Sequence, residues 1–211
     1  MNKINRTTFA CIIIIIFGCA LFYQGTDGLQ AFTAETARVN QLLEDQPAFP
    51  NVTFEDSEGR IYPISEFEGK YVFITYIYTA CTTVCPQLEM NMAQVYEQIP
   101  HEYMGKDIVF LSISFDPARD DPATLKKYRH YFGADGETWR MARIPNETEL
   151  QSLLDEFGVI VIPDGKGNFA HNSAFYLVDP NGSLIDVMDY REIDQAATKV
   201  LSLLESERGN Q

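Results

Sequence analysis

The most constraining feature of the sequence is a run of β-branched and aromatic residues at 71–78, YVFITYIY. A run of this length without alternating polar residues is typical of a strand that is buried on both faces, as in a parallel sheet covered by helices. It is followed at once by TACTTVCP at 79–86, and residues 86–98 have the apolar spacing of an amphipathic helix. The sequence therefore predicts a strand, a short turn that carries two cysteines, and a helix.

Strands and helices alternate along the rest of the body. A second buried strand is predicted at 108–114, and helices are predicted at 123–131, 147–157 and 193–204. Central strands that are joined by helices become parallel neighbours through right-handed crossovers. This order predicts an α/β protein with a thioredoxin-like fold, an N-terminal β-hairpin and an inserted β-hairpin near the C-terminus. The remaining strands are predicted at 52–54, 60–63, 138–142, 175–178 and 184–187.

The N-terminal segment has a different character from the body. Lys3 and Arg6 precede an apolar run from Phe9 to Tyr23. A positive end before a short apolar stretch is the pattern of a secretory signal or an N-terminal membrane anchor. Because the positive end stays in the cytoplasm, we expect a membrane-anchored protein whose body lies on the extracytoplasmic side, in the periplasm or on the outer face of a bacterial cell.

A further interpretation of this segment involves Cys19. The sequence Ile16-Phe17-Gly18-Cys19 resembles a bacterial lipoprotein cleavage box, in which the chain is cut before the cysteine and the cysteine is lipidated. The residues leave open whether the segment is a lipoprotein signal or an uncleaved anchor. We therefore assign residues 1–30 to a signal, membrane anchor or lipoprotein signal, residues 31–46 to a linker or short helix, and residues 47–211 to one thioredoxin-like domain.

The formal net charge of the chain is -14. This charge excludes nucleic acid as a partner, because its phosphates require clustered lysine and arginine. An acidic body suits a cation or a basic protein partner, and it also describes an ordinary solvated surface.

Two of the four cysteines, Cys81 and Cys85, lie in the turn between the first buried strand and its helix. Ligands of parallel sheets bind at the carboxyl ends of strands, and a helix N-terminus lowers the pKa of a nearby thiol. With three residues between them, the two sulfurs can converge on one metal ion or form a disulfide. Sulfur ligands select Cu(I) or Zn, and an imidazole completes either site.

Topology favours His171 among the three histidines as the third ligand. It precedes the strand predicted at 175–178, whose amino end meets the carboxyl ends of the parallel strands beside the cysteines. His101 follows the first helix and His130 lies near the carboxyl end of the second, so both are expected at the opposite edge of the sheet. The stretch before His171 is long and rich in glycine, which predicts a mobile ligand.

Asp116 leaves the second buried strand at the same edge as the cysteines. A carboxylate at this place could orient His171 or accept a hydrogen bond beside the metal site. It could equally organise the turn, while Asp120 or Asp121 caps the following helix.

Three segments together resemble the Sco/SenC family of copper proteins: TACTTVCP at 79–86, SFDPARDDPATLKKY at 114–128 and HNSAFYLVDPNG at 171–182. The resemblance covers residues 46–205, which is almost the whole body. It implies a thioredoxin-like fold and a copper-binding domain.

The resemblance also implies a copper site of two cysteines and one histidine, which map onto Cys81, Cys85 and His171 and hold Cu(I) or Cu(II). Asp116 and Asp120 match the family's D-P-x-x-D element. The implied role is assembly of the dinuclear copper centre of cytochrome c oxidase subunit II, by delivering copper or by keeping the cysteines of that subunit reduced. Another copper donor or a thiol reductant would be a further partner.

We favour a copper metallochaperone that performs no enzymatic turnover. The same thiols would serve a thiol-disulfide oxidoreductase acting on exported proteins, in which Cys81 attacks and Cys85 resolves the mixed disulfide. Such a reductase has no need of His171. A peroxidase would need an arginine near its cysteine, and none is close in sequence to Cys81. A copper-responsive sensor would bind the metal without transferring it.

Overall fold

The N-terminal part of the chain forms a unit of its own. The computed structural model describes residues 5–25 and 33–209, and the chain divides into two units at Asp45. The first unit contains helices α1 (Arg6–Gly25) and α2 (Ala34–Asp45). Helix α1 is long and apolar enough to cross a membrane, a property that it shares with signal sequences.

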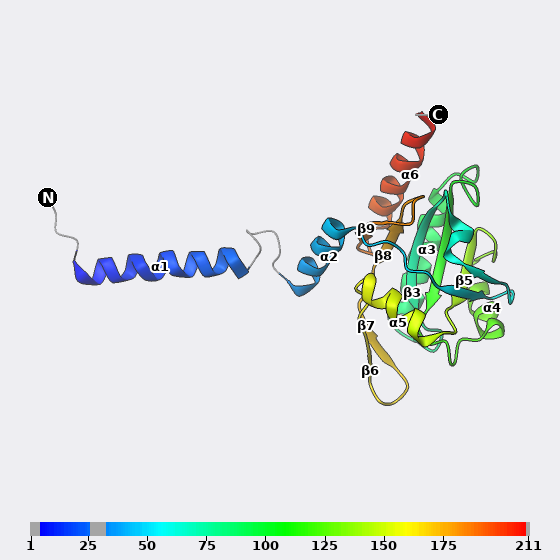
Figure 1. The fold of residues 1–211 in the computed structure, drawn as a ribbon, viewed down its shortest axis with the longest axis horizontal. Coiled ribbons are helices and arrows are strands. Elements are labelled where there is room, and N and C mark those ends of the chain that lie inside the picture. Colours follow the sequence, from blue (N-terminus) through cyan, green and yellow to red (C-terminus); the bar gives the residue numbers. More distant parts are fainter. Residues whose placement is uncertain (1–4, 26–32, 210–211) are drawn as a thin grey trace. The chain divides into compact units, whose positions relative to one another are not determined.

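The second unit contains a seven-stranded sheet, with strand order β2-β1-β5-β4-β3-β8-β9, and a separate two-stranded hairpin, β6-β7 (Figure 1). Helices α3 and α6 pack against each other. The order of elements confirms the predicted thioredoxin-like α/β fold, with both predicted hairpins present. The elements are β1 (Thr53–Asp56), β2 (Ile61–Pro63), the 3-10 helix η1 (Ile64–Phe67), β3 (Tyr71–Ile77), α3 (Val84–Gln98), β4 (Ile108–Ser114), α4 (Pro122–His130), β5 (Trp139–Arg143), α5 (Glu147–Glu156), β6 (Val161–Pro163), β7 (Phe169–His171), β8 (Phe175–Val178), β9 (Leu184–Met188) and α6 (Ile193–Gly209).

The centre of the sheet is the parallel pair β3 and β4. These strands pair in register from Tyr71 with Ile108 to Ile77 with Ser114, and every residue of both strands is buried. Strand β5 is parallel to β4, whereas β8 is antiparallel to β3. The carboxyl ends of β3 and β4 therefore lie at the same edge as the amino end of β8, as the sequence predicts.

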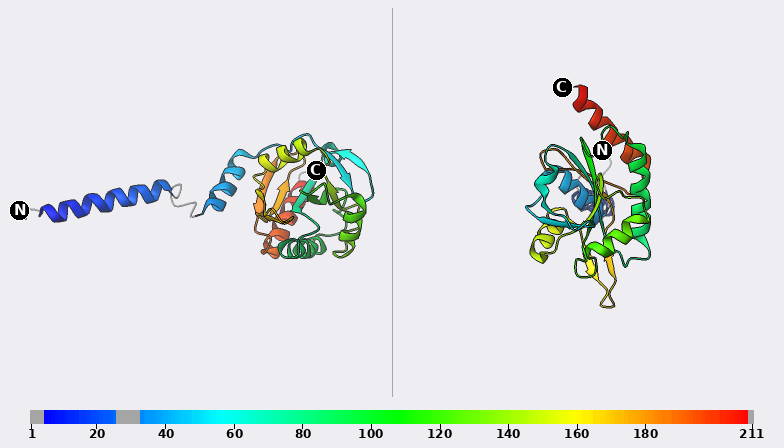
Figure 2. Two further views of the ribbon diagram at one scale, coloured as in Figure 1. Left: turned by 90° about the horizontal axis from the view of Figure 1, so that it is seen from below. Right: turned by 90° about the vertical axis from the view of Figure 1, so that its right-hand side faces the viewer.

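The hairpin β6-β7 is an element that the sequence analysis does not predict. It lies between α5 and β8 and projects from the body in two views (Figures 1 and 2). The glycine-rich stretch forms its tip, where Gly165 and Gly167 have φ angles of 71° and 93°, a region that suits glycine. Asp164 fastens this tip by accepting hydrogen bonds from the backbone N–H groups of Lys166 and Asn168. The stretch expected to be a mobile loop is thus a hydrogen-bonded hairpin that ends at His171.

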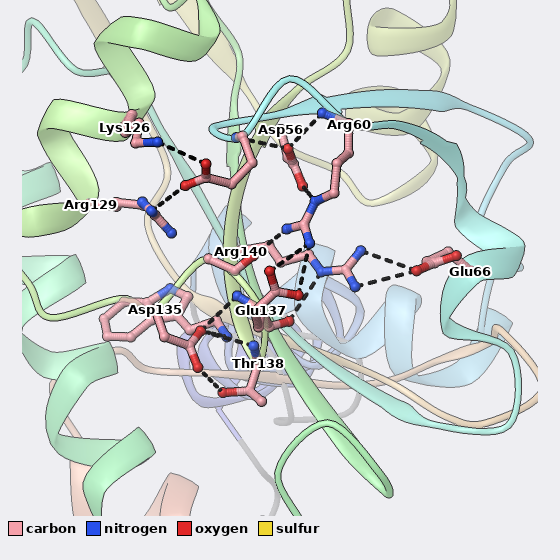
Figure 3. A network of polar contacts seen from close by, with 12 residues as sticks. Asp56, Arg60, Glu66, Lys126, Arg129, Asp135, Glu137, Thr138 and Arg140 are labelled. Atoms are coloured by element: carbon pink, nitrogen blue, oxygen red, sulfur yellow. Dashed lines mark hydrogen bonds and ion pairs between the residues drawn. The ribbon is translucent and has the colours of Figure 1, made fainter.

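A network of ion pairs fastens the turn of the β1-β2 hairpin to α4 and to the segment before β5 (Figure 3). Asp56 is fully buried and accepts a hydrogen bond from Arg60 Nε at 2.7 Å, and Arg60 also pairs with Glu137. In the same turn, Glu58 pairs with Lys126 and Arg129 of α4. Part of the acidic charge of the body is therefore neutralised within the protein.

Glu89 of α3 is a buried carboxyl group in the core. Its two oxygens accept hydrogen bonds from Thr75 Oγ1 at 2.7 Å and Ser112 Oγ at 2.8 Å, which come from paired positions on β3 and β4. In the described part of the chain, no lysine or arginine forms an ion pair with it. Burial disfavours the charged form and raises the pKa of Glu89 to about 7.

Replacing Glu89 with Gln is expected to remove a pH dependence of stability. The folded pKa of about 7 lies above the ordinary value of 4.5, so the folded state binds the proton more tightly and the free energy of unfolding falls as the pH rises between these values. The fall amounts to about 3 kcal/mol in the unsubstituted protein. Urea unfolding of both proteins at pH 5 and pH 8 measures it, and an equal pH dependence in the two would contradict the prediction.

Candidate metal centre

The loop that carries the cysteines begins where β3 ends, and Asp120 fixes it in place. Asp120 is fully buried and accepts hydrogen bonds from the backbone N–H of Thr79 at 3.0 Å and from the hydroxyl groups of Thr79 and Ser114. Thr79 stands two residues before Cys81, and Ser114 ends β4. Asp120 therefore links the cysteine loop to the end of the neighbouring strand.

Cys81 lies at the N-terminus of α3 and serves the helix as an acceptor. Thr83 stands at the N-cap position, but its side chain makes no capping hydrogen bond. The Cys81 Sγ instead accepts from the backbone N–H of Cys85 at 3.4 Å. An N-cap side chain normally supplies an oxygen to the free N–H groups of the first turn. Here a sulfur atom has that role.

The pKa values of the two thiols are shifted in opposite directions. Burial raises the pKa of Cys81, but hydrogen bonds from the backbone N–H groups of Cys85 and Thr83 outweigh it and leave the pKa below its ordinary value. Cys85 is fully buried, and this burial raises the pKa of its thiol well above the ordinary range. Both cysteines are free thiols in this structure. Cys81 is therefore the more acidic thiol of the pair, and Cys85 is the one that keeps its proton.

His171 reaches Cys85 from the end of the β6-β7 hairpin. Its Nε2 lies 3.4 Å from Cys85 Sγ, while its Nδ1 lies 3.0 Å from the carbonyl oxygen of Asn172. A carbonyl oxygen only accepts, so Nδ1 carries the proton and Nε2 presents its lone pair to the sulfur. Burial lowers the pKa of His171, which keeps the imidazole neutral at pH 7. This is the form in which imidazole binds a metal.

Aromatic rings surround the imidazole. The ring of Phe115 lies 5.0 Å from that of His171, and the ring of Tyr78 lies 6.3 Å from it, measured between centroids. Phe169, two residues before His171 on β7, packs edge-on against both Tyr78 and Phe115. These three residues could not be assigned to the site from the sequence, because they are ordinary strand-end or loop aromatics until the hairpin folds over them.

Among residues 5–25 and 33–209, no three His, Cys, Asp or Glu side chains already converge closely enough to hold a metal. Two sulfurs and one imidazole nitrogen nevertheless occupy one edge of the sheet, and this donor set fits a soft cation such as Cu(I). The Cys81 Sγ would have to exchange its hydrogen bond with the Cys85 N–H for the metal.

The other predicted positions lie elsewhere. Asp116 forms an ion pair with Arg119 and organises the turn, whereas the partners of His171 Nδ1 are the Asn172 carbonyl and the Ser173 hydroxyl, so of the two roles left open for Asp116 the structure shows the local one. Asp121 caps α4 by accepting from the backbone N–H of Thr124. His101 follows the far end of α3 and His130 ends α4, both exposed, as expected from the topology.

Comparison with known proteins assigns the chain to a family. The SCO1/SenC family model matches residues 43–205, which is more than half of the chain.

The chain belongs to the SCO1/SenC family.

Individual relatives from the same family have moderate sequence identity to this chain. The SCO1 protein homolog of Bacillus subtilis is 28% identical over 144 residues, which are 67% of this chain and 72% of that protein. The structure of BsSco, a Sco-family cytochrome c oxidase assembly protein with a disulfide switch, has 25% identity and a TM-score of 0.65 over 74% of this chain and 93% of its own. Copper-bound ScoI of Bradyrhizobium japonicum shares the fold, with 22% identity and a TM-score of 0.62 over 74% of this chain and 98% of its own.

Cys81 is expected to react with iodoacetamide at least about tenfold faster than Cys85 at pH 7, because thiolates and not thiols are alkylated. Brief labelling of the reduced, metal-free protein, followed by peptide mapping, measures both rates. The mapping also separates them from Cys11 and Cys19, which are exposed in α1. Faster labelling of Cys85 would overturn the assignment of the two thiols.

Proposed function

We propose that this chain binds copper through Cys81, Cys85 and His171 and serves the assembly of cytochrome c oxidase. The observation that carries the proposal is the 3.4 Å approach of His171 Nε2 to Cys85 Sγ, between segments that are distant in sequence. A lone pair on that nitrogen and two sulfur atoms form a donor set that copper accepts in both of its common oxidation states. The family and the copper-bound relative described above support the choice of copper.

In this proposal copper is carried to a partner protein, and each of the three ligands has a separate task. Cys81 has the lower pKa of the two thiols and loses its proton more readily, so it is suited to make the first bond to incoming copper. Cys85 must lose its proton to become a ligand, so binding releases a proton. His171 then closes the site from the hairpin. Release to a partner requires only the exchange of thiolate ligands.

Within cytochrome c oxidase, we propose that the recipient is the dinuclear copper centre of subunit II. The chain would either deliver copper to that centre or keep its cysteines reduced. Another copper donor or a thiol reductant would restore the chain after each round. We place the body, residues 47–211, outside the cytoplasm, tethered by residues 1–30, since α1 has the length and composition of a membrane span.

A thiol-disulfide reductase is the second candidate, and one observation favours it. Cys81, whose pKa is lowered, and Cys85, whose pKa is raised, have the relative acidities of an attacking thiol and a resolving thiol. In this role, Cys81 would attack a partner disulfide, and Cys85 would release the reduced partner by forming the Cys81–Cys85 disulfide. A disulfide switch has been identified in the relative BsSco.

Copper titration of single variants tests the ligand set. Cys81→Ser and Cys85→Ser are each expected to lower the Cu(I) affinity by at least about a hundredfold, measured by competition with a Cu(I) chelator, because two-coordinate thiolate binding is lost. His171→Ala is expected to retain Cu(I) and to lose the thiolate-imidazole Cu(II) spectrum. His130→Ala, which removes an exposed imidazole of α4, is the matched control. Unchanged copper binding in Cys81→Ser would refute the proposed site.

The same variants separate the two candidate functions. A reductase does not need the imidazole, so His171→Ala would keep disulfide reduction while it loses copper transfer to subunit II. Loss of both activities together in His171→Ala would contradict this division of tasks.

Deletion of residues 1–30 is expected to move the protein from the membrane fraction to the soluble fraction. The deletion removes α1 and leaves the second unit intact. Cys19→Ala in the full chain distinguishes the two tethers: it abolishes membrane retention or processing if Cys19 is lipidated, and it has no effect on an uncleaved anchor. Mass spectrometry of the mature amino terminus measures the outcome. A full-length protein that remains soluble would refute the tether.

A further inference from the structure

The attachment of the β6-β7 hairpin to the body determines where His171 lies. The hairpin forms a two-stranded sheet of its own and does not pair with the seven-stranded sheet. At its base, Asn172 accepts from the backbone N–H of Ile160 and donates to the carbonyl of Gly158. Further out, the Tyr78 hydroxyl accepts from the backbone N–H of Phe169 at 3.4 Å. Few polar contacts of the described residues therefore hold the strand that bears His171.

Arg119 lies where this strand meets the body. Its guanidinium carbon is 5.8 Å from the centroid of the Tyr78 ring and 5.5 Å from that of the Phe169 ring, within the range of cation–π attraction. The hairpin tip also comes close, because a Cβ atom added to Gly167 would stand 3.4 Å from an Arg119 nitrogen. One guanidinium thus lies against the ring that directly follows β3 and the ring at the start of β7, with the tip of the hairpin close by.

An ion pair with Asp116 orients Arg119. The Asp116 carbonyl also accepts from the backbone N–H groups of Arg119 and Asp120, which closes the turn after β4. The side chain thereby extends from a rigid turn. A planar guanidinium can pair with a carboxylate and stack on aromatic rings at once, which the compact ammonium of lysine does less well.

Phe169 connects Arg119 to the candidate ligand. Residues two apart in a strand point to the same side, so Phe169 and His171 face the body together. Both rings lie against Tyr78 and Phe115. A contact that holds Phe169 in place therefore also holds His171.

We propose that Arg119 is a positioning residue that fastens the β6-β7 hairpin, and with it His171, over the two cysteines. Arg119 does not touch the metal and acts through Phe169 and Tyr78. The proposal rests on the proposed function in one respect, which is that His171 is a copper ligand. Without Arg119, the hairpin would leave the body more often, and a site that needs the imidazole would weaken while a site of two thiolates would not.

The test uses the full chain with Arg119→Ala, Arg119→Lys and a matched control, Arg208→Ala. Arg208 has nearly the same exposure, 39% against 41%, and makes an ion pair with Glu102 and a cation–π contact with Tyr103 away from the site. Amide exchange of the metal-free protein, resolved by NMR, is expected to speed up about tenfold at Phe169 in Arg119→Ala, because two cation–π contacts are lost. Arg119→Lys should recover part of this protection, and Arg208→Ala should leave it unchanged.

Copper spectra provide the second measurement. Arg119→Ala is expected to shift the Cu(II) spectrum towards that of His171→Ala while its Cu(I) affinity stays within about twofold of the unsubstituted protein, since thiolates alone hold Cu(I). Unchanged Phe169 exchange in Arg119→Ala would overturn the proposal. So would faster exchange spread evenly over the sheet with a lower melting temperature, because Arg119 would then be merely structural. Faster Phe169 exchange in a chain that binds no copper would support the positioning and refute the proposed function instead.

Discussion

The parallel pairing of β3 with β4 is the interaction on which the rest of the structure depends. Both strands are buried throughout and pair along seven consecutive positions, so their carboxyl ends leave the sheet side by side. The loop after β3 carries the cysteines, and the turn after β4 carries Asp116, Arg119 and Asp120. Asp120 joins the two loops through Thr79 and Ser114. The register of these two strands therefore determines where the site lies, whichever residues serve as ligands.

Much of the fold and part of the site could be predicted from the sequence. Unbroken runs of β-branched and aromatic residues indicate the buried strands. The capping residue Asn146 indicates the start of α5, and in the structure it accepts from the backbone N–H groups of Thr148 and Glu149. The position of His171 beside Cys85 follows from the antiparallel direction of β8, which brings the preceding residue to the correct edge. These features depend on local pattern and chain direction, which a sequence contains.

The β6-β7 hairpin and its surroundings could not be predicted in the same way. Each strand has only three residues, and β6 ends in a proline, so neither has a periodic pattern. Arg119 is distant in sequence from Cys81 and reaches Tyr78 only through the turn after β4. Asp116 could orient His171 or pair locally, and the ion pair with Arg119 decides between these roles. Such contacts depend on tertiary packing of side chains that look ordinary in the sequence.

The sulfur atom at the start of α3 has a consequence for how tightly any ion is held. In the metal-free protein, the Cys85 N–H and the dipole of α3 favour the negatively charged form of Cys81. A cation bound at the same sulfur must replace the Cys85 N–H hydrogen bond, so the helix and the cation compete for the lone pairs of Cys81 Sγ. When the cation leaves, the hydrogen bond from the Cys85 N–H to the Cys81 sulfur can form again. The backbone N–H of Cys85 thus competes with any bound cation for the Cys81 sulfur, and this competition lowers the affinity of the sulfur for the cation.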